Sequence, residues 1–430
     1  MRRHPLSSQQ LLKDVAKLHI KDIDLGLERF QTLLMRLGQP HENLPPVIHV
    51  AGTNGKGSTI AYLQSIFEEA GYSVHAFTSP HLVNVHESIT LAGQHIDEET
   101  FSSLLQEVIK ANAGAAMTVF EAISAVSFLA FTRTKGHIVL LETGMGGAGD
   151  TTNVVKHPIL CAITPISVDH SEFLGKSLAE IASHKAGIIK RDVPCVIAKQ
   201  DSEVYQVIRD RSKALKAPLY RQGRDWFVKR TGRQMVFEGW DGDYAWPLPA
   251  LAGDHQVENA GLALACLEVL KGQHSLHEET IRHGLQHAYW PGRLEQVNAN
   301  DFLSPAWQLW LDGGHNEAAA KVLRQQIKRW NDKPLYVICG MMKRKNSKAF
   351  LKEIAGLADH IYTVPIPDKD CKKPEKLANQ VQDAGGLATA CEDIEFALNL
   401  IKAERKTPGR VLICGSLYLL GAFYALRART

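Results

Sequence analysis

The sequence predicts an α/β protein with a large N-terminal domain, built on a doubly wound and mostly parallel sheet, and a smaller C-terminal α/β domain of the Rossmann type. Continuous apolar runs at 137–142, 159–164 and 194–198 suit parallel strands that helices cover on both faces. A length of 430 residues exceeds one typical core. A Pro-Gly break at 289–293 ends a helical stretch, so we expect the domain boundary between residues 290 and 291.

Before the break, helix-like and strand-like segments alternate. Apolar side chains that recur every three to four residues indicate helices, and short apolar runs indicate strands. Further strands are predicted at 46–50 and 73–78, and helices at 25–37, 60–70, 119–133 and 255–271. Residues 220–250 are richer in aromatic side chains and in alternation, which predicts a small antiparallel section.

After the break, the same alternation returns on a smaller scale. Strands are predicted at 307–312, 334–339, 360–364 and 410–414, and helices at 316–329, 347–357 and 392–403. These elements predict a second α/β domain over 291–430, and about 140 residues is an ordinary size for a domain.

Composition excludes several classes of protein. A hydrophobic content of 45% and a charged content of 22% are ordinary for globular proteins. A net charge of +3 argues against nucleic-acid or membrane-surface binding, and no apolar stretch approaches the ~18 residues of a membrane span. The seven cysteines are scattered, odd in number and never form C-x-x-C, which suits reduced thiols. We therefore expect a cytoplasmic enzyme without nucleic-acid or membrane partners.

Residues 50–59 (Val-Ala-Gly-Thr-Asn-Gly-Lys-Gly-Ser-Thr) combine the end of a strand, a glycine-rich turn and the start of a helix. Glycines let the backbone N–H groups point inward, and the helix N-terminus and Lys56 add positive charge, so the turn can hold phosphate. Ser58 offers a hydroxyl to the Mg²⁺ that accompanies a nucleoside triphosphate. An ordinary tight turn explains the glycines but not Lys56 and Ser58 among them. The N-terminal domain is therefore expected to have a P-loop ATPase-type fold.

The spacing of this loop departs from the usual G-x-x-x-x-G-K-[ST]. Val50 stands where the first glycine is expected, and Gly57 follows the lysine. The segment is therefore a nucleotide loop of a particular kind.

Polar residues also follow three neighbouring strands of the predicted sheet. Ser79, Glu142 and the pair Asp169-His170 stand at or just after strand ends, and such ends meet at one edge of a parallel sheet. Serine and carboxylate oxygens suit Mg²⁺, whereas a histidine nitrogen is a less usual ligand. A lone strand-end glutamate is more often a cap or a surface charge, so the joint occurrence favours a site.

Lys185, Arg293 and the segment 312–316 also call for interpretation. Lys185, in an otherwise apolar helix end, is read most simply as a lysine that extends to solvent at a helix C-terminus. Asp312-Gly313-Gly314-His315-Asn316 follows a strand and resembles a second phosphate-facing turn. Arg293 either reaches phosphate or pairs with a local carboxylate.

With these residues assembled, the chain resembles the folylpolyglutamate synthase/dihydrofolate synthase family of Mur-type ATP-dependent amide ligases, in its bacterial bifunctional form. The resemblance covers essentially the whole chain and rests on the order and number of its motifs. These are 52–58, 78–82, Phe120-Glu121, 141–147, 150–153, Asp169-His170, 184–188, His255-Gln256 with Asn259, 291–295, Asp312 with His315-Asn316, and 414–418, together with the N-terminal segment 24–29.

The resemblance implies an ATP-dependent ligase that joins L-glutamate to dihydropteroate and to reduced folates through an acyl phosphate, in folate biosynthesis. It implies two Mg²⁺ sites, a monovalent cation, and a monomeric enzyme. Residues 1–290 would form the ATP-binding Mur-ligase central domain with an N-terminal folate-binding segment, and residues 291–430 the C-terminal glutamate-ligase domain.

The same resemblance implies a role for individual residues. Those implied in catalysis are Lys56, Glu142, His170 and Lys185. Those implied in ATP binding are Gly52, Thr53, Asn54, Gly55, Lys56, Gly57, Ser58, Thr59, Asn259, Arg293, Asp312 and His315. The implied metal ligands are Ser58, Ser79, Glu142, His170, and Lys185 once carbamylated. The implied folate-binding residues are Leu25, Phe120, Asp150 and Thr151.

The sequence departs from the family pattern at positions that concern the acid substrate. Ser88 and Ala148 stand where many members carry arginine, and the segment 340–345, expected to bind ADP or glutamate, is unusually basic but keeps Lys345. The alternatives are therefore an enzyme that extends folates only, or another Mur-type ligase.

A ligase of cell-wall nucleotides would need an N-terminal nucleotide-binding domain, for which the ~46 residues before the loop are too few. A regulatory module without ligase activity would not need Lys56, Glu142, His170 and Lys185 together.

Overall fold

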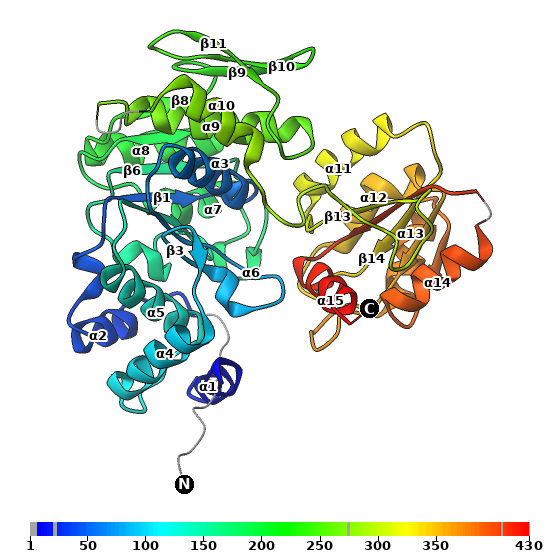
Figure 1. The fold of residues 1–430 in the computed structure, drawn as a ribbon, viewed down its shortest axis with the longest axis horizontal. Coiled ribbons are helices and arrows are strands. Elements are labelled where there is room, and N and C mark those ends of the chain that lie inside the picture. Colours follow the sequence, from blue (N-terminus) through cyan, green and yellow to red (C-terminus); the bar gives the residue numbers. More distant parts are fainter. Residues whose placement is uncertain (1–6, 20–23, 273–275, 406, 430) are drawn as a thin grey trace. The chain divides into compact units, whose positions relative to one another are not determined.

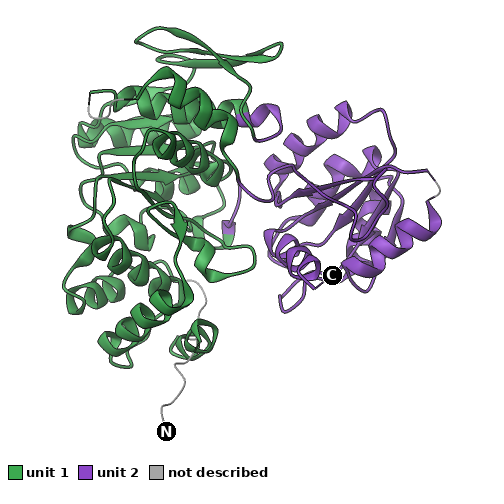
Figure 2. Cartoon of the chain, in the orientation of Figure 1, with its two compact units in different colours: residues 1–166, 172–250, 257–289 green, residues 167–171, 251–256, 290–430 purple. Residues whose placement is uncertain are grey.

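The structure is a computed structural model that describes residues 7–19, 24–272, 276–405 and 407–429. It divides into two compact units (Figure 2). Unit 1 contains residues 1–166, 172–250 and 257–289, and unit 2 contains residues 167–171, 251–256 and 290–430. Two short segments, Ser167–Ser171 and Leu251–Gln256, thus belong to unit 2 although the chain on both sides of each belongs to unit 1.

Unit 1 is built on an eight-stranded sheet with the order β4-β3-β2-β5-β1-β6-β7-β8 (Figure 1). The strands from β2 to β8 in this order are parallel, and β3 and β4 continue the sheet in antiparallel fashion. The strands are β1 (Val47–Ala51), β2 (Val74–Phe77), β3 (Ile89–Leu91), β4 (Gln94–His95), β5 (Ile138–Glu142), β6 (Leu160–Ile163), β7 (Cys195–Ile197) and β8 (Leu219–Arg221). Central β1 and β5 are buried along their whole length, as their continuous apolar sequences require.

A separate antiparallel sheet, β11-β10-β9, also belongs to unit 1. Its strands are β9 (Phe227–Thr231), β10 (Gln234–Glu238) and β11 (Asp243–Pro247). The helices of unit 1 are α1 (Ser8–Val15), α2 (Glu28–Arg36), α3 (Lys56–Glu69), α4 (Glu98–Asn112), α5 (Val119–Arg133), α6 (Ser171–Leu174), α7 (Leu178–Ala186), α8 (Ser202–Leu215), α9 (Asp254–Val269) and α10 (Glu278–His287), with 3₁₀ turns η1 (Pro40–Glu42), η2 (Val85–Ser88) and η3 (Thr151–Val154). Helices α6 and α9 begin within the two short segments of unit 2.

Unit 2 contains a six-stranded sheet with the order β12-β13-β17-β14-β15-β16, in which only β12 runs antiparallel to its neighbour. Its strands are β12 (Glu295–Val297), β13 (Gln308–Asp312), β14 (Leu335–Cys339), β15 (His360–Thr363), β16 (Ala388–Ala390) and β17 (Arg410–Cys414). Its helices are α11 (Glu317–Arg329), α12 (Ser347–Ile354), α13 (Pro374–Asp383), α14 (Ile394–Glu404) and α15 (Leu417–Arg427), with the 3₁₀ turn η4 (Ala355–Leu357). One core cluster joins α11, α12 and α13 to β14, β15 and β17.

The predicted fold class is confirmed, and the differences from prediction lie at element ends and in several helices and short strands that were not predicted. Helix α3 begins at Lys56 rather than near residue 60, because Gly55 adopts a left-handed φ of 96° and serves as its N-cap. Strand β8 pairs with β7 in parallel, so the antiparallel section begins after residue 221 rather than at 220. The elements that were not predicted include helices α1, α4, α8, α13 and α15 and strands β3, β4, β12 and β16. Helix α15 is apolar on nearly all sides and shows no periodic pattern.

Two further expectations from the sequence concern the cysteines and membrane-spanning segments. All seven cysteines are free thiols, and six of them are buried. Within the described ranges, no helix has both the length and the apolar character that a membrane crossing requires.

Candidate active site

The phosphate loop is shaped by two glycines that no other residue can replace without displacement. Gly52 has a φ of 146°, and a Cβ there would stand 1.8 Å from Thr164 Oγ1. A Cβ on Gly55 would stand 2.4 Å from the amide oxygen of Asn259 on α9. The Thr53 N–H donates to the Pro165 carbonyl at 3.0 Å. The loop is thus packed against the segment after β6 and against α9.

Lys56 and Glu142 lie together at this loop. The Lys56 ammonium donates to the carbonyls of Gly52 and Thr53 at 3.3 and 3.4 Å and lies 3.7 Å from Glu142 Oε1. Glu142, the last residue of β5, is only 4% exposed, and its Oε2 accepts the Ser79 N–H at 3.3 Å. The predicted strand-end residues Ser79 and Glu142 therefore do meet beside the lysine of the loop.

Buried hydroxyl groups surround the same place. Within the described part of the chain, the hydroxyls of Thr59, Thr143 and Thr164 are buried without a hydrogen-bond partner. Thr59 is in the loop, Thr143 follows Glu142, and Thr164 packs against Gly52. Because unpaired buried polar groups are costly, these hydroxyls indicate a place prepared for a polar ligand.

The residues at the loop fit Mg²⁺. Ser58 is buried in the first turn of α3, and its hydroxyl and the Glu142 carboxylate would supply the hard oxygen ligands that Mg²⁺ prefers. The described residues contain no cluster of three or more His, Cys, Asp or Glu side chains able to hold a metal.

Lys185 does not extend to solvent, so the simpler interpretation of this residue is wrong. It lies in the last turn of α7, is 5% exposed, and donates from Nζ to the Gly52 carbonyl at 2.7 Å. The glycine-rich segment 143–149 is joined to the same helix end, since the Ala148 N–H donates to the His184 carbonyl at 2.7 Å. A Cβ on Gly147 would stand 2.7 Å from that carbonyl, which explains the glycine.

The four residues implied in folate binding gather along the segment 143–149. A Cβ on Gly149 would stand 2.9 Å from the Leu25 carbonyl, and a Cβ on Gly144 would stand 2.3 Å from the Phe120 ring. Asp150 follows the segment directly, and the hydroxyl of the next residue, Thr151, lies 2.7 Å from that of Ser124 on α5.

Asp150 is held by a buried chain of hydrogen bonds that the sequence did not reveal. Its Oδ2 accepts the Met145 N–H at 2.8 Å, and its Oδ1 accepts the N–H and hydroxyl of Thr152 at 3.0 and 2.6 Å. The same hydroxyl lies 2.8 Å from His49 Nε2. Because the hydroxyl donates to the carboxylate, His49 must donate to the hydroxyl.

Burial acts on the pKa values at both ends of this chain of bonds. It raises the pKa of Asp150, while the donors from Met145 and Thr152 act in the opposite direction. It lowers the pKa of His49 to about 3, with a smaller contribution from the charge of Lys190, so the imidazole is neutral at pH 7.

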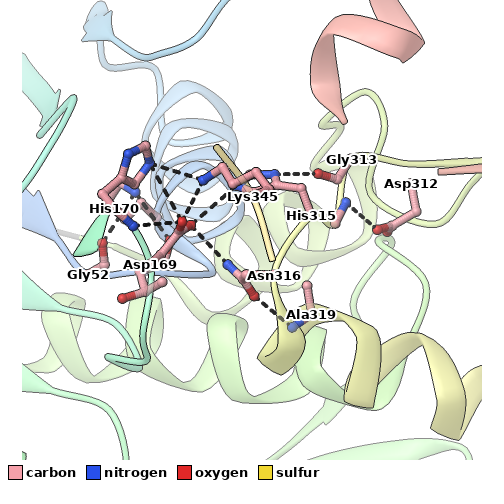
Figure 3. Close-up of polar contacts among 12 residues, drawn as sticks. Gly52, Asp169, His170, Asp312, Gly313, His315, Asn316, Ala319 and Lys345 are labelled. Atoms are coloured by element: carbon pink, nitrogen blue, oxygen red, sulfur yellow. Dashed lines mark hydrogen bonds and ion pairs between the residues drawn. The ribbon is translucent and has the colours of Figure 1, made fainter. Parts of the chain in front are cut away.

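In unit 2, a second polar cluster is centred on Asp169 (Figure 3). Asp169 Oδ1 accepts from Lys345 Nζ at 2.5 Å, and Oδ2 lies 3.3 Å from His315 Nε2 and accepts from Asn316 Nδ2 at 3.1 Å. His170 Nε2 lies 3.3 Å from the same ammonium.

The cluster sets the charge of Asp169. Burial alone would raise the pKa of Asp169, but the hydrogen bond and charge of His315 and the charges of Lys345 and His170 outweigh it and place this pKa far below its usual range. The sequence analysis named Asp169 with His170 among the strand-end residues but gave it no role of its own.

Asp312 and Arg293 lie near each other in unit 2 but have clear structural contacts. Asp312 is buried at the end of β13, and its two oxygens accept the N–H groups of Gly314 and Leu294 at 2.8 and 3.0 Å. Burial raises the pKa of Asp312, and the charge of Arg293 acts against this. Arg293 also donates to the Gly292 carbonyl at 3.3 Å.

The site residues expected from sequence are thus divided between the two units. Unit 1 brings together the phosphate loop (Gly52 to Thr59), Ser79, Glu142, Lys185, Asn259 and the folate set. Unit 2 contains His170, Arg293, Asp312 and His315. His170 thus lies in unit 2 with Asp169 and Lys345, whereas the other expected metal ligands lie in unit 1.

Comparison with known proteins identifies the family of this arrangement. The Mur ligase middle domain matches residues 50–267, and the dihydrofolate synthetase C-terminal domain matches residues 295–427. A dihydrofolate synthase/folylpolyglutamate synthase of Bacillus subtilis is 34% identical over 412 residues, which cover 92% of this chain and 93% of that protein. The structure of Escherichia coli FolC in complex with DHPP and ADP matches with a TM-score of 0.89 and 29% identity over 99% of this chain and 98% of the other.

A further solved structure is a bifunctional folylpolyglutamate synthase/dihydrofolate synthase with Mn, AMPPNP and L-glutamate bound. It matches with a TM-score of 0.85 and 29% identity over 97% of each chain. Together with the loop, the buried Glu142 and Lys185, and the two α/β units, these matches show that the chain belongs to the dihydrofolate synthase/folylpolyglutamate synthase family of Mur-type ligases.

Proposed function

We propose that this protein is an ATP-dependent ligase that adds L-glutamate to dihydropteroate and to the γ-carboxylate of reduced folates. One observation carries the proposal. The short segment from Glu142 to Thr151 begins beside Lys56 of the phosphate loop, passes the Phe120 ring at Gly144 and reaches the Leu25 carbonyl at Gly149. A phosphate-binding place and an apolar place for an aromatic acid are therefore joined by a single glycine-rich connection.

The reaction that suits this arrangement has two steps. A carboxylate oxygen of the acid attacks the γ-phosphorus, so an O–P bond forms while the bond to ADP breaks and an acyl phosphate results. The amine of glutamate, after losing a proton, attacks the acyl carbon through a tetrahedral intermediate; the C–N bond forms and phosphate leaves. Both steps develop negative charge on phosphate oxygens, which positive groups must offset.

Each of the expected site residues takes a part in this proposal. Lys56 and the loop N–H groups hold the phosphates, and Ser58, Ser79 and Glu142 hold one Mg²⁺, which when bound neutralises the charge of the phosphates. His170 contributes to a second Mg²⁺ site. Further ATP contacts are assigned to Asn259, Arg293, Asp312 and His315. We propose that residues 1–290 form the ATP-binding central domain with the folate-binding segment, and that residues 291–430 form the glutamate-ligase domain, which adds the ATP contacts of Arg293, Asp312 and His315.

Lys185 is proposed to act as a carbamate. The Nζ of a carbamylated lysine keeps one N–H, so the bond to the Gly52 carbonyl is compatible with the modified side chain. The modification replaces a buried positive charge by a negative one, which adds an oxygen ligand for a cation beside the phosphate loop.

The acid substrate is proposed on the relatives and on the contacts of Phe120, Asp150 and Thr151. The E. coli relative was solved with DHPP and ADP, and another relative with L-glutamate. Ser88 is buried at the end of η2, and its carbonyl accepts the Thr78 N–H at 3.0 Å, whereas Ala148 is exposed. The arginines found at these positions in many members are thus replaced by one buried and one exposed small residue.

The test is glutamate-dependent release of ADP by the purified full-length protein. We expect release with dihydropteroate plus L-glutamate, and also with a reduced folate plus L-glutamate. Absence of turnover with both acids would contradict the ligase proposal. Turnover with reduced folate alone would identify the protein as a folylpolyglutamate synthase only.

A further inference from the structure

The histidines of this chain are concentrated in one stretch of unit 1. Residues 274–287 contain four of the 19 histidines, and local enrichment in histidine is a compositional signal of metal binding. Two of them, His283 and His287, stand four residues apart on helix α10. Residues at this spacing lie on the same face of a helix, as in helical zinc sites that use two histidines.

Helix α10 holds this pair on a closely packed support. A Cβ on Gly284 would stand 2.5 Å from the Ile66 Cα, so α10 lies directly against helix α3 (Figure 1). Gly284 and Leu285 are buried, whereas the side chains of His283 and His287 are 49% and 63% exposed. One face of the helix is therefore anchored in the unit, and another presents both imidazoles to solvent.

The two rings are close enough for one metal ion to reach both. Their centroids are 5.6 Å apart, and their planes are inclined at 69°. A metal ion bound about 2.0–2.1 Å from an imidazole nitrogen lies about 3 Å from the centre of that ring. The observed separation is therefore compatible with two ligands of a single ion.

Contacts within the protein leave one nitrogen of each ring for a metal. His287 Nδ1 lies 2.9 Å from the His283 carbonyl oxygen, which can only accept, so Nδ1 carries a proton and Nε2 holds the lone pair of the neutral ring. His283 Nε2 lies 2.9 Å from Glu279 Oε1, which places the lone pair of that neutral ring on Nδ1. Metal-binding histidines commonly make such a second bond to a carbonyl or carboxylate, which orients the ring.

The charges beside the pair favour a cation. The carboxylate of Glu69, at the end of α3, lies 3.7 Å from His287 Nδ1, and Glu279 contacts His283. The guanidinium of Arg282 lies 3.6 Å from Glu279 and offsets part of this negative charge. Among the described residues, no three His, Cys, Asp or Glu side chains converge on one metal position, so the carboxylates act as outer partners of the rings.

We propose that His283 and His287 together bind one divalent late transition-metal ion on the surface of unit 1, with water in its remaining coordination positions. Imidazole nitrogen suits Cu²⁺, Ni²⁺ and Zn²⁺, whereas Mg²⁺ requires oxygen ligands, so the chemistry of this site differs from that of the phosphate loop. The inference does not depend on the ligase proposal, because none of these residues is assigned a part in that reaction.

The test is a calorimetric titration of the full-length protein with NiCl₂, without nucleotide and in a buffer that does not bind the metal. We expect one ion per chain at the tightest site. Two ligands on one support act through their effective concentration, so removal of either imidazole should weaken this binding about 100-fold. His283→Gln, His287→Gln and the double variant should therefore lose nearly the same affinity. Separate and additive losses would show two independent surface histidines and refute the shared site.

The matched control is His95→Gln/His157→Gln, which removes two exposed histidines from other parts of unit 1. The control should bind Ni²⁺ like the wild type, whereas Glu279→Gln should weaken binding about tenfold because it removes the outer partner of His283. Unchanged affinity in His287→Gln, or an equal loss in the control, would overturn the inference.

Two further readouts separate metal binding from misfolding and from catalysis. Without metal, the double variant should unfold in urea like the wild type, since both side chains are exposed. Added Ni²⁺ should raise the urea midpoint of the wild type but not that of the double variant, because a ligand of the folded state alone stabilises it. Equal midpoint shifts in both proteins would contradict the site. ADP release with Mg²⁺ should be the same in both, so a failed ligase assay would refute the proposed function alone.

Discussion

The buried chain of hydrogen bonds from His49 through Thr152 to Asp150 predicts that loss of the Thr152 hydroxyl alone lowers the stability of the protein. In Thr152→Val the hydroxyl is replaced by a methyl group of similar size. The change removes the 2.8 Å bond from His49 and the 2.6 Å bond to Asp150 in a place that is fully buried. A buried donor left without a partner costs about 1–3 kcal/mol, and a lost bond to a charged group about 1.5–3 kcal/mol. We therefore expect the variant to lose about 3 kcal/mol of stability.

Thr152→Ser is the matched control, because it keeps the hydroxyl and loses one buried methyl group. Its expected cost is about 1 kcal/mol. The two variants should thus differ by about 2 kcal/mol in urea unfolding followed by circular dichroism. The KM for dihydropteroate should rise in the valine variant more than in the serine variant, since Asp150 loses the donor that orients its carboxylate. Equal destabilisation by both variants would refute the role of the hydrogen-bond chain.

Three other outcomes follow from the geometry. The pKa of His49 is about 3 in the folded protein and about 6.5 in the unfolded chain, so between these pH values the unfolded state binds more protons and stability falls as the pH is lowered. From pH 6.5 to pH 5 the free energy of unfolding should fall by about 2 kcal/mol. The variant His49→Gln should lose this part of the pH dependence when urea unfolding is measured at each pH. Lys185→Ala should lose activity, and bicarbonate or a short carboxylate should restore part of it in an ADP-release assay; activity near that of the wild type would contradict the carbamate. Gly52→Ala should lower ATP affinity at least about tenfold by calorimetry, because its Cβ would collide with Thr164 at a strained φ, whereas Gly356→Ala, whose Cβ meets nothing within 4 Å, should bind ATP normally.

Much of the fold was predictable because its signals are local. The continuous apolar runs of β1, β5, β6 and β7 identify a parallel sheet, and its strand ends identify where Ser79 and Glu142 must lie. Helix α15 was not predictable in this way, since the sequence LYLLGAFYALR is apolar on almost every side and lacks a periodic pattern.

The part of the site that sequence reasoning missed depends on contacts between distant residues. His49 and Thr152 are 103 positions apart, and Asp169 and Lys345 are 176 apart, so no spacing rule relates them. Lys185 shows the same limit. Its neighbours along the chain indicate an ordinary helix end, whereas its burial against Gly52 results from the packing of α7 on the loop.

The five residues Ser167–Ser171 bear on how the two units could be inherited or exchanged. A gene fragment that encodes only residues 290–430 would carry Lys345 and His315 without Asp169, and would leave the ammonium and the imidazole around a missing carboxylate. A shuffled C-terminal domain would then lack the centre of its own polar cluster, unless the new host supplied an aspartate at the same place in the chain. Because Asp169 is encoded between two segments of unit 1, unit 2 cannot be transferred as one uninterrupted segment with this cluster intact.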